Sequence, residues 1–197
     1  VMSEQQAATL GVFLDRDSVD RGDLELDALF ASLPDWRVYQ ATGASEVAER
    51  VAGAQVVLTN KVVFDESLLA GAGQLRLICV TATGVNNIDL DAAQAQGITV
   101  CNVRDYATAS VVQHVFALIL CLNRHLLEYQ QAARDGRWRQ SSQFCLLDFP
   151  ITELTGKRLG VVGYGVLGQA VARTAECFGM QVLIAERAGQ APRPGRV

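Results

Sequence analysis

Short apolar runs alternate with helix-prone stretches along the first hundred residues of the chain. Short runs rich in Val, Ile and Leu are typical of strands that are buried on both faces. Such runs occur at Leu10–Leu14, Arg37–Gln40, Gln55–Thr59, Leu75–Thr81 and Ile98–Cys101, and stretches that favour helices lie between them at Leu24–Leu33, Ser45–Val51, Glu66–Ala70 and Leu90–Gln96. Strands that alternate with helices predict an α/β fold with a parallel, flavodoxin-like sheet.

The second half of the chain opens with a predicted long helix, from about Thr108 to Arg134. Apolar residues recur there at the three- and four-residue spacing of a helical face. The polar segment Asp135–Thr152 follows and carries Trp138, Phe144 and Phe149. Because large exposed apolar side chains usually mark a contact surface, we predict that this segment is an extended excursion packed against another surface and not a linker.

A glycine-rich turn is the most specific pattern in the sequence. It lies in Arg158-Leu-Gly-Val-Val-Gly-Tyr-Gly-Val-Leu-Gly168, which predicts a strand, a turn and the start of a helix, and a second strand is predicted from Met180. The glycines Gly163, Gly165 and Gly168 fit the pattern G-x-G-x-x-G. The first allows a tight turn, the second lets a pyrophosphate approach the backbone, and the third lets the helix pack closely on the strand. This unit predicts a bound dinucleotide, with a purely structural glycine turn as the alternative.

Two residues near the end of the chain bear on which dinucleotide is bound. Glu186 follows Gly165 by 21 residues, about where an acid accepts hydrogen bonds from the adenosine ribose. A carboxylate at this position favours NAD, because it would repel the 2′-phosphate of NADP. Arg187 is able to hold that phosphate instead, so NADP is the alternative.

The composition is that of an ordinary globular protein, with 50% hydrophobic and 19% charged residues. The longest apolar run is too short to span a bilayer and no signal-peptide pattern opens the chain, so we expect a cytoplasmic protein without a membrane partner. The arginines do not cluster with aromatic residues, which argues against nucleic-acid binding. The five cysteines lack the spacing of a metal site, and we expect them to be reduced residues of the core.

Three segments, taken in their order along the chain, resemble one known family. They are Thr81-Ala-Thr-Gly-Val-Asn-Asn-Ile-Asp89, then Asn102-Val-Arg-Asp-Tyr106 ahead of the long helix, and then the glycine turn. The chain resembles the D-isomer-specific 2-hydroxyacid dehydrogenases over essentially its whole length, and among them the glycerate dehydrogenases, or hydroxypyruvate reductases. The resemblance implies an NAD-dependent oxidoreductase that reversibly reduces a small 2-keto acid, such as hydroxypyruvate or glyoxylate, to a D-2-hydroxy acid such as D-glycerate. Phosphoglycerate and formate dehydrogenases, and dinucleotide-sensing corepressors of the same fold, are the alternatives.

The resemblance also implies two domains. Residues 1–104 correspond to the substrate-binding (catalytic) domain, and residues 105–197 correspond to the first part of an NAD-binding Rossmann domain. A complete dinucleotide-binding fold has about six strands, whereas the sequence of the second part predicts two or three. We therefore expect an N-terminal fragment, and we expect the protein to form a homodimer through the second half of the chain.

The cofactor and substrate residues follow from the same resemblance. In the family the glycine turn and its acid hold NAD, which implicates Gly163, Gly165, Val166, Leu167, Gly168, Glu186 and Arg187. The turn of Thr83, Gly84 and Val85 is similar to the family loop that offers backbone N–H groups to the substrate carboxylate, and Thr83 also lies near the cofactor. A simple turn capped by Asn86 and Asp89 is the alternative.

Three further positions are implied by the resemblance or by their place at the end of an element. Lys61 follows a predicted strand on the same edge of the first domain, so it is a candidate to add positive charge to the substrate site, with a solvated surface lysine as the alternative. Thr108 and Val112, at the start of the long helix, correspond to positions that approach the nicotinamide.

The residues that perform the chemistry in this family are an arginine, an acid and a histidine. None has a matching position in this sequence, and we expect all three beyond Val197. His114 and His125 have no motif-matched acid, so we interpret them as helix or interface residues and not as the catalytic histidine.

Overall fold

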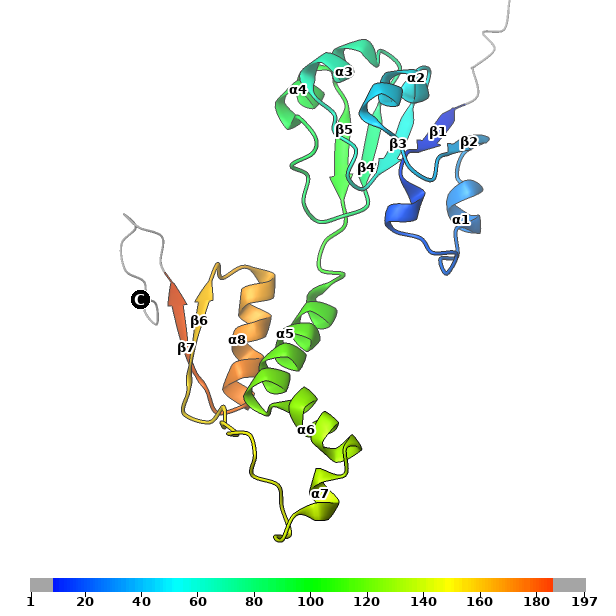
Figure 1. The fold of residues 1–197 in the computed structure, drawn as a ribbon. Helices are drawn as coiled ribbons and strands as arrows, with labels where there is room; N and C mark the ends of the chain where they lie inside the picture. The colour runs from blue at the N-terminus through cyan, green and yellow to red at the C-terminus, as the bar shows by residue number, and fades with distance from the viewer. Residues whose placement is uncertain (1–8, 186–197) are drawn as a thin grey trace, which may run out of the picture. The chain divides into compact units, whose positions relative to one another are not determined.

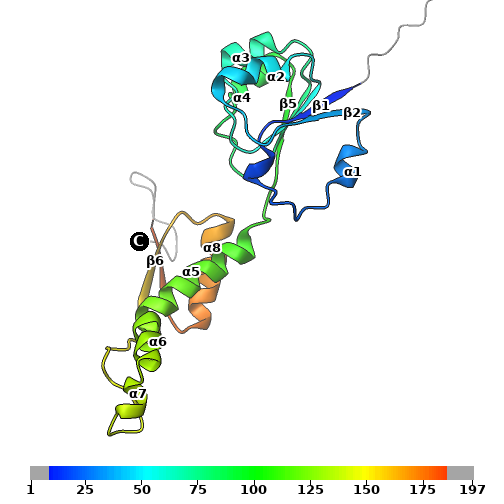
Figure 2. The ribbon, with the colours of Figure 1, turned by 45° about the vertical axis from the view of Figure 1, so that its right-hand side comes forward.

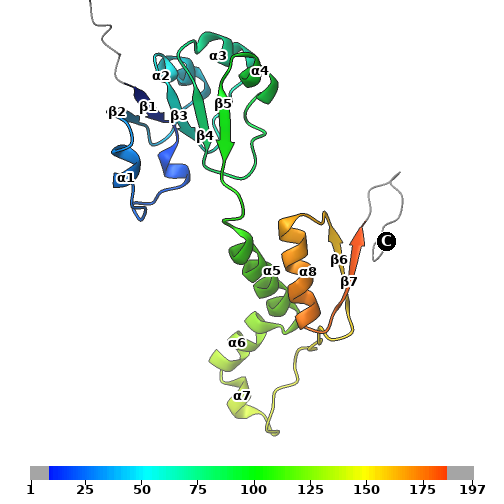
Figure 3. The same ribbon diagram turned by 180° about the vertical axis from the view of Figure 1, so that it is seen from behind.

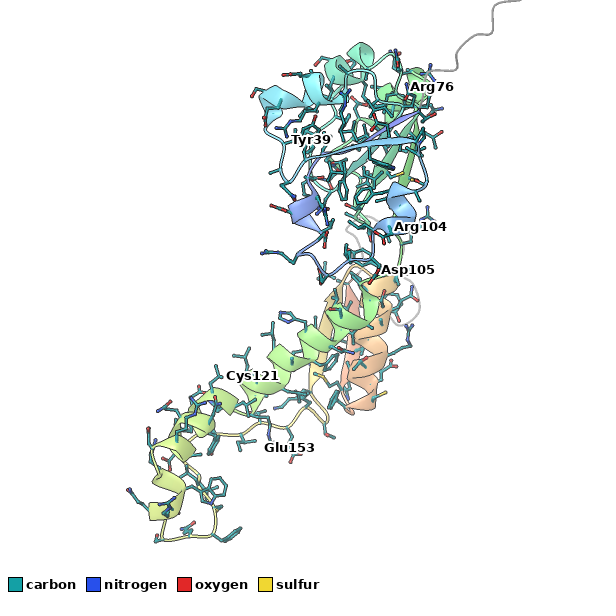
Figure 4. The ribbon with its side chains drawn as sticks, turned by 90° about the vertical axis from the view of Figure 1, so that its right-hand side faces the viewer. Tyr39, Arg76, Arg104, Asp105, Cys121 and Glu153 are labelled. Atoms are coloured by element: carbon teal, nitrogen blue, oxygen red, sulfur yellow. The ribbon has the colours of Figure 1, made fainter. Side chains whose placement is uncertain are left out.

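The computed structural model describes residues 9–185, which form two compact units divided between Arg104 and Asp105. Figure 1 shows the elements in chain order, and Figure 4 labels the two residues at the division. The first unit contains a five-stranded sheet, and the second contains a two-stranded sheet with its own helices.

All neighbouring strands of the first unit are parallel, in the order β2-β1-β3-β4-β5. They are β1 (Leu10–Phe13), β2 (Asp35–Val38), β3 (Val56–Thr59), β4 (Leu77–Val80) and β5 (Thr99–Asn102). This is the strand order of a flavodoxin-like sheet, so the predicted fold class is confirmed. Each predicted strand is present, and its ends differ from the prediction by at most two residues.

Three helices cover one side of this sheet and bury its core (Figure 2). They are α2 (Val47–Val51), which follows a short 3₁₀ turn at Ala44–Glu46, α3 (Glu66–Gly71) and α4 (Leu90–Ala95). Successive side chains of a strand point to opposite faces, and Val12, Val57 and Ile78 point from the central strands into this core, where their exposure is 0%. The alternation of side chains along each strand therefore determines which residues enter this core.

The opposite side of the sheet has a tighter constraint at its β2 edge. The Trp36 ring of β2 lies over Gly11, its register partner on β1, and a Cβ atom on Gly11 would come within 2.6 Å of that ring. Helix α1 (Asp27–Phe30) lies on this side, where Phe30 packs edge-on against Trp36 with ring centroids 6.0 Å apart. Glycine is thus required at position 11 by the ring beside it.

Helix α1 is much shorter than the predicted helix at Leu24–Leu33. The cause lies upstream, where Arg16–Ser18 form a 3₁₀ turn and the buried Asp20 carboxylate accepts hydrogen bonds from three consecutive backbone N–H groups. These donors are Gly22, Asp23 and Leu24, at 2.8, 3.1 and 3.2 Å. A side chain that captures backbone donors in this way competes with helix formation, so the helix starts later.

The second unit is built around a strand, a helix and a second strand, as the glycine-turn pattern predicts (Figure 3). Strands β6 (Arg158–Val162) and β7 (Gln181–Ala185) are parallel neighbours, and α8 (Val166–Cys177) connects them through the turn. Helix α5 (Thr108–Asn123) packs on α8, and Phe116 stacks on Phe178 with ring centroids 5.2 Å apart.

The predicted long helix is wrong in one respect, because it is two helices. After α5, His125 adopts a left-handed backbone conformation with φ 47°, and α6 (Leu126–Arg134) leaves at a bend of 60°. The carbonyl of Asn123, the last residue of α5, accepts a hydrogen bond from Thr152 N–H at 3.0 Å. Among residues 9–185 no single helix is long and apolar enough to cross a membrane, and α5 with α6 meets that test only as a bent pair.

The segment Asp135–Thr152 is not wholly extended, since it contains the short helix α7 (Arg137–Gln140). One of its aromatic residues packs within the unit, because Phe149 lies edge-on to Tyr129 at 5.2 Å and its carbonyl accepts a hydrogen bond from the Tyr129 hydroxyl at 2.8 Å. An ion pair between Arg137 and Asp148 joins the two ends of the segment. Trp138 and Phe144 stay exposed, at 52% and 95%.

The expectation that the cysteines lie in the core is also wrong. All five are free, and none is fully buried: Cys101 and Cys177 are exposed, and Cys79, Cys121 and Cys145 are half-buried. Figure 4 labels Cys121 on α5. Cys79 and Cys101 lie on strands, but strand alternation turns them away from the face that packs against α2, α3 and α4.

Candidate functional site

The glycine turn joins β6 to α8 through Gly163 and Gly165. Gly163 has φ +89°, a left-handed conformation that favours glycine, and it reverses the chain directly after the strand. Gly165 is the N-cap residue of α8, and its carbonyl accepts the first helical hydrogen bond from Gln169 N–H at 2.9 Å. The local sequence thus places the start of a helix at the carboxyl end of a parallel strand.

Gly168 lies in the first turn of α8, where the helix meets the strand. A Cβ atom at this position would be 2.1 Å from the Gly163 carbonyl oxygen and 3.3 Å from a methyl group of Val161. Backbone atoms cannot yield to such an overlap without moving the helix. The third glycine therefore serves the close packing of helix on strand that the pattern predicts.

Gly165 differs from Gly168 because a Cβ atom on it would meet nothing within 4 Å. The backbone N–H groups of Val166, Leu167 and Gly168 precede the first helical hydrogen bond, so they point out of the helix end. Val166 and Leu167 are 53% and 44% exposed at this end. Open space in front of outward-pointing donors at the positive end of a helix dipole fits a bound phosphate group.

The two residues expected to select the dinucleotide, Glu186 and Arg187, lie outside the described residues. Strand β7 ends at Ala185, directly before Glu186 in the sequence. The ends of β6 and β7 are parallel neighbours, with Val162 in register with Ala185.

The loop of Thr83, Gly84 and Val85 follows β4 and is held by the residues after β5. Asn102 donates a side-chain hydrogen bond to the Thr83 carbonyl at 2.7 Å, and the Thr83 hydroxyl donates to the Val103 carbonyl at 2.9 Å. Within residues 9–185 the backbone N–H groups of Thr83, Gly84 and Val85 donate to no other residue. The loop is thus fixed at its oxygen atoms while its N–H donors are available to an anion.

The alternative reading of this loop assigns Asn86 and Asp89 as its caps. Asp89 has a different role, since its carboxylate accepts a hydrogen bond from Ala92 N–H at 3.0 Å and caps helix α4. The Asn86 side-chain oxygen lies 3.2 Å from where a Cβ atom on Gly84 would be, so glycine leaves room for it.

Lys61 lies in the loop after β3, next to the loop after β4. Asn87 joins the two loops by donating to the Val62 carbonyl at 2.9 Å. The Lys61 side chain is exposed and lines an open hollow of about 580 Å³ with Thr42, Asp65 and Ser67. Residues 83–85 do not line this hollow, so the described residues place Lys61 in the adjacent loop without placing it at the same cavity.

Asp15, which follows β1 and is only 7% exposed, was not predicted from the sequence as a functional residue. It accepts hydrogen bonds from Asn60 N–H at 2.9 and 3.0 Å and from Lys61 N–H at 2.8 Å. Asp15 therefore fixes the backbone that carries Lys61. A charged residue directly after an apolar run was the available signal, because the carboxyl ends of parallel strands meet at one edge of the sheet.

Thr108 and Val112 lie on the first turns of α5, as predicted. They line an open hollow of about 620 Å³ together with Ala170, Arg173 and Thr174 of α8. The glycine turn does not contribute to the lining of this hollow. The described second unit thus brings Thr108 and Val112 to the flank of α8 and not to its N-terminus.

The two histidines lie on different helices. His114 is exposed on α5, whereas His125 precedes α6, pairs with Glu128 at 3.2 Å and stacks on Phe149 with ring centroids 6.0 Å apart. The Glu128 backbone N–H and the His125 ring lower the pKa of the Glu128 carboxyl. His125 thus has a local structural partner in the helix that it begins.

Comparison with known proteins gives one consistent match. The family model for the D-isomer-specific 2-hydroxyacid dehydrogenase catalytic domain matches residues 17–191. A glycerate dehydrogenase of Methylorubrum extorquens is 42% identical over 173 residues, which are 87% of this chain and 54% of that protein. A hydroxypyruvate reductase of Blautia hydrogenotrophica is 37% identical over 175 residues, again 87% of this chain and 54% of that protein.

Solved structures agree with the sequence comparisons. A D-lactate dehydrogenase of Aquifex aeolicus, solved with NAD and lactic acid, superposes with a TM-score of 0.72 at 26% identity. The match covers 92% of this chain and 52% of that one. The chain therefore spans about half the length of the relatives that it matches.

Alanine substitutions at Gly168 and Gly165 should differ in their effect on the free energy of unfolding, because only the first adds a methyl group in a closely packed place. We expect Gly168→Ala to lower the free energy of unfolding by about 1–3 kcal/mol or more, because the added methyl group overlaps the Gly163 carbonyl. Gly165→Ala adds the same methyl group where nothing lies within 4 Å, so it should change that free energy by less than about 1 kcal/mol. Urea denaturation followed by circular dichroism measures both, and equal losses would contradict the packing role of Gly168.

Replacement of Asp15 should destabilise the first unit. We expect Asp15→Ala to lower the free energy of unfolding by about 2 kcal/mol or more, since it leaves the N–H groups of Asn60 and Lys61 without their charged acceptor. Asp15→Asn retains one acceptor oxygen and should lose less. Asp17→Ala is the matched control, because Asp17 is an exposed neighbour. A loss for Asp15→Ala no larger than for Asp17→Ala would show that these hydrogen bonds do not hold the loop.

Proposed function

Because the chain belongs to the D-isomer-specific 2-hydroxyacid dehydrogenase family, we propose that the whole protein is an NAD-dependent oxidoreductase that acts on small 2-keto acids. Hydroxypyruvate or glyoxylate is the proposed substrate, and the D-2-hydroxy acid, D-glycerate in the first case, is the product of a reversible reaction. Support comes from the two relatives at 42% and 37% identity, whose names are glycerate dehydrogenase and hydroxypyruvate reductase.

The glycine turn is the observation on which the cofactor proposal rests. The open space at Gly165 and the outward N–H groups of Val166 and Leu167 suit the pyrophosphate of a nicotinamide dinucleotide. Bound NADH would supply the hydride that reduces the keto carbon. The similarity to a dehydrogenase solved with NAD supports the same assignment.

We favour NAD over NADP on the strength of Glu186. A carboxylate after the second strand would accept hydrogen bonds from the ribose hydroxyls and repel a 2′-phosphate. Arg187, next in the sequence, is the residue that would make NADP acceptable.

The substrate carboxylate is proposed to bind at Thr83, Gly84 and Val85. Three backbone N–H groups that donate to no other described residue are available as donors to a carboxylate. Asn102 keeps that loop in place through the Thr83 carbonyl. Lys61, fixed by Asp15 in the adjacent loop, would add positive charge nearby.

In this proposal the described residues bind and orient the reactants but do not move the proton. We propose, as the resemblance implies, that the catalytic arginine, acid and histidine lie beyond Val197. Thr108 and Val112 are proposed to approach the nicotinamide. The pairing of His125 with Glu128 and its stacking on Phe149 support a local structural role for this histidine.

We further propose a homodimer formed through the second unit. Helices α5 and α6 expose four leucines, Leu118, Leu122, Leu126 and Leu127, at 52%, 74%, 58% and 64%. Trp138 and Phe144 add exposed aromatic surface in the segment that follows. Large exposed apolar side chains on a folded protein are typical of an interaction site, and a second copy presents the same side chains in a two-fold arrangement.

Titration of the purified chain with NAD tests the cofactor site. We expect Gly165→Ala to weaken NAD binding about tenfold or more, a loss of about 1.4 kcal/mol, because its methyl group occupies the space proposed for the pyrophosphate. Gly73→Ala is the matched control, since its added Cβ atom also meets nothing within 4 Å but lies in the first unit. Equal affinities for the wild type and both variants would refute the site.

The same purified chain tests whether the proton-transfer residues lie outside these 197 residues. We expect the 197-residue chain to show no measurable oxidation of NADH with hydroxypyruvate, because general acid–base catalysis contributes about 10²–10⁴ in rate and its residues are expected elsewhere. Turnover by this chain at a rate typical of dehydrogenases would contradict this prediction and would make His114 or His125 the candidate proton donor.

Light scattering at micromolar concentration tests the dimer. We expect a dimer for the wild type and a monomer for Leu122→Glu, because a carboxylate cannot be buried in an apolar interface without a partner. Leu90→Glu, which places the same charge on an exposed leucine of the first unit, should remain dimeric. A wild-type monomer, or a dimer that persists in Leu122→Glu, would contradict the proposed surface.

A further inference from the structure

Two cysteines face each other across neighbouring strands of the first unit. Cys79 of β4 and Cys101 of β5 are register partners in a parallel pair. Their sulfur atoms are 3.4 Å apart, and both thiols are free. Among residues 9–185 this is the one sulfur–sulfur contact of the chain.

The backbone beneath these two residues already has the spacing that a disulfide needs. Paired strands lie about 4.7–4.9 Å apart, and disulfides join residues whose Cα atoms are about 4.4–6.8 Å apart. A disulfide has a sulfur–sulfur length of about 2.05 Å, so the sulfur atoms must approach by rotation of the two side chains. No strand has to change its register.

A small oxidant can reach the pair from the edge of the sheet. Strand β5 is the last strand in the sheet order, and Cys101 on it is exposed, while Cys79 is half-buried. Both side chains point away from the core, because Ile78 and Val80 alternate with Cys79 and are buried on the other face. Oxidation would therefore not require opening of the core.

We propose that Cys79 and Cys101 are a reversible oxidation site, which closes to a disulfide when the protein meets hydrogen peroxide. The Cys101 thiolate attacks one peroxide oxygen, the O–O bond breaks, and a sulfenic acid and one water result. The Cys79 sulfur then attacks the Cys101 sulfur, the S–O bond breaks, and the hydroxyl group leaves as a second water with the Cys79 proton. The two thiols lose two electrons and two protons, and peroxide is reduced to two waters.

The order of the two steps follows from the environments of the two sulfurs. Burial, and then the neighbouring Cys101, raise the pKa of Cys79 to about 12. Cys79 is therefore a protonated thiol at neutral pH and a poor first nucleophile. The exposed Cys101 meets peroxide first, and disulfide closure should become faster as the pH rises toward the pKa of Cys79.

The proposal does not depend on the dehydrogenase assignment. Its structural effect would fall on the strands that carry the Thr83 loop, because Asn102, which holds the Thr83 carbonyl, directly follows Cys101. A covalent link between β4 and β5 would fix their separation next to that loop.

Peptide mapping of the full chain tests the proposal without any substitution. Protein treated with peroxide, alkylated under denaturing conditions and digested should yield one cross-linked species that contains Cys79 and Cys101, and dithiothreitol should abolish it. The protein should stay unchanged in oligomeric state, because the bond forms within one chain. Recovery of both residues as alkylated thiols, or of Cys101 as sulfinic acid beside a free Cys79, would overturn the proposal.

A matched set of variants adds a second test. The variant with Cys121→Ser, Cys145→Ser and Cys177→Ser keeps only the pair, and peroxide should remove both of its thiols. With Cys79→Ser added, Cys101 should stop at a sulfenic acid that dimedone traps. With Cys101→Ser added instead, the Cys79 thiol should survive the same exposure. Equal loss of the remaining thiol in these last two variants would show that Cys101 is not the site of first attack.

Discussion

Parallel strand pairing is the constraint on which the first unit depends, because it places the carboxyl ends of all five strands at one edge. Loops that are far apart in sequence then bond to one another. Asp15 after β1 holds the backbone after β3, and Asn102 at the end of β5 holds the Thr83 loop after β4. Each loop is fixed by a polar side chain from a neighbouring strand end. At the Thr83 loop the carbonyl and hydroxyl are bonded, while among the described residues the N–H groups of residues 83–85 have no acceptor, which is why an anion suits this loop.

In the second unit, close packing of a helix on a strand, and not hydrogen bonds between loops, positions the backbone donors. At Gly168 the helix approaches the strand so closely that no side chain fits, and this contact sets where the helix N-terminus points. Gly165, three residues earlier, is the N-cap residue of this helix. Glycine at position 168 is thus required by the packing of helix on strand, whereas a Cβ atom at position 165 would meet nothing within 4 Å. The two sites present donors from backbone atoms, whose positions depend on packing and not on rotamers.

Local sequence patterns predicted the strands of the first unit well, because each strand is a short apolar run between helix-prone or polar stretches. The errors arose where a single side chain overrides periodicity. His125 adopts a left-handed conformation and divides the predicted long helix, and Asp20 captures the N–H groups that would have begun an earlier helix. Asp15 was missed because its partners lie 45 and 46 residues away. The glycine turn, in contrast, was predictable because its residues are nearly consecutive in the sequence. The exposure of Cys101 was not predictable, since it depends on which strand lies at the edge of the sheet.

The contact between Gly11 and Trp36 carries a consequence for how this sheet can vary among related chains. A side chain at position 11 would overlap the Trp36 ring, because the indole occupies the space into which that side chain would project. A larger residue at 11 is acceptable only together with a smaller one at 36, and Phe30, which rests edge-on against the indole, would then lose its own support. These three positions therefore form a coupled set, and drift at one of them during evolution is conditional on compensating change at the other two.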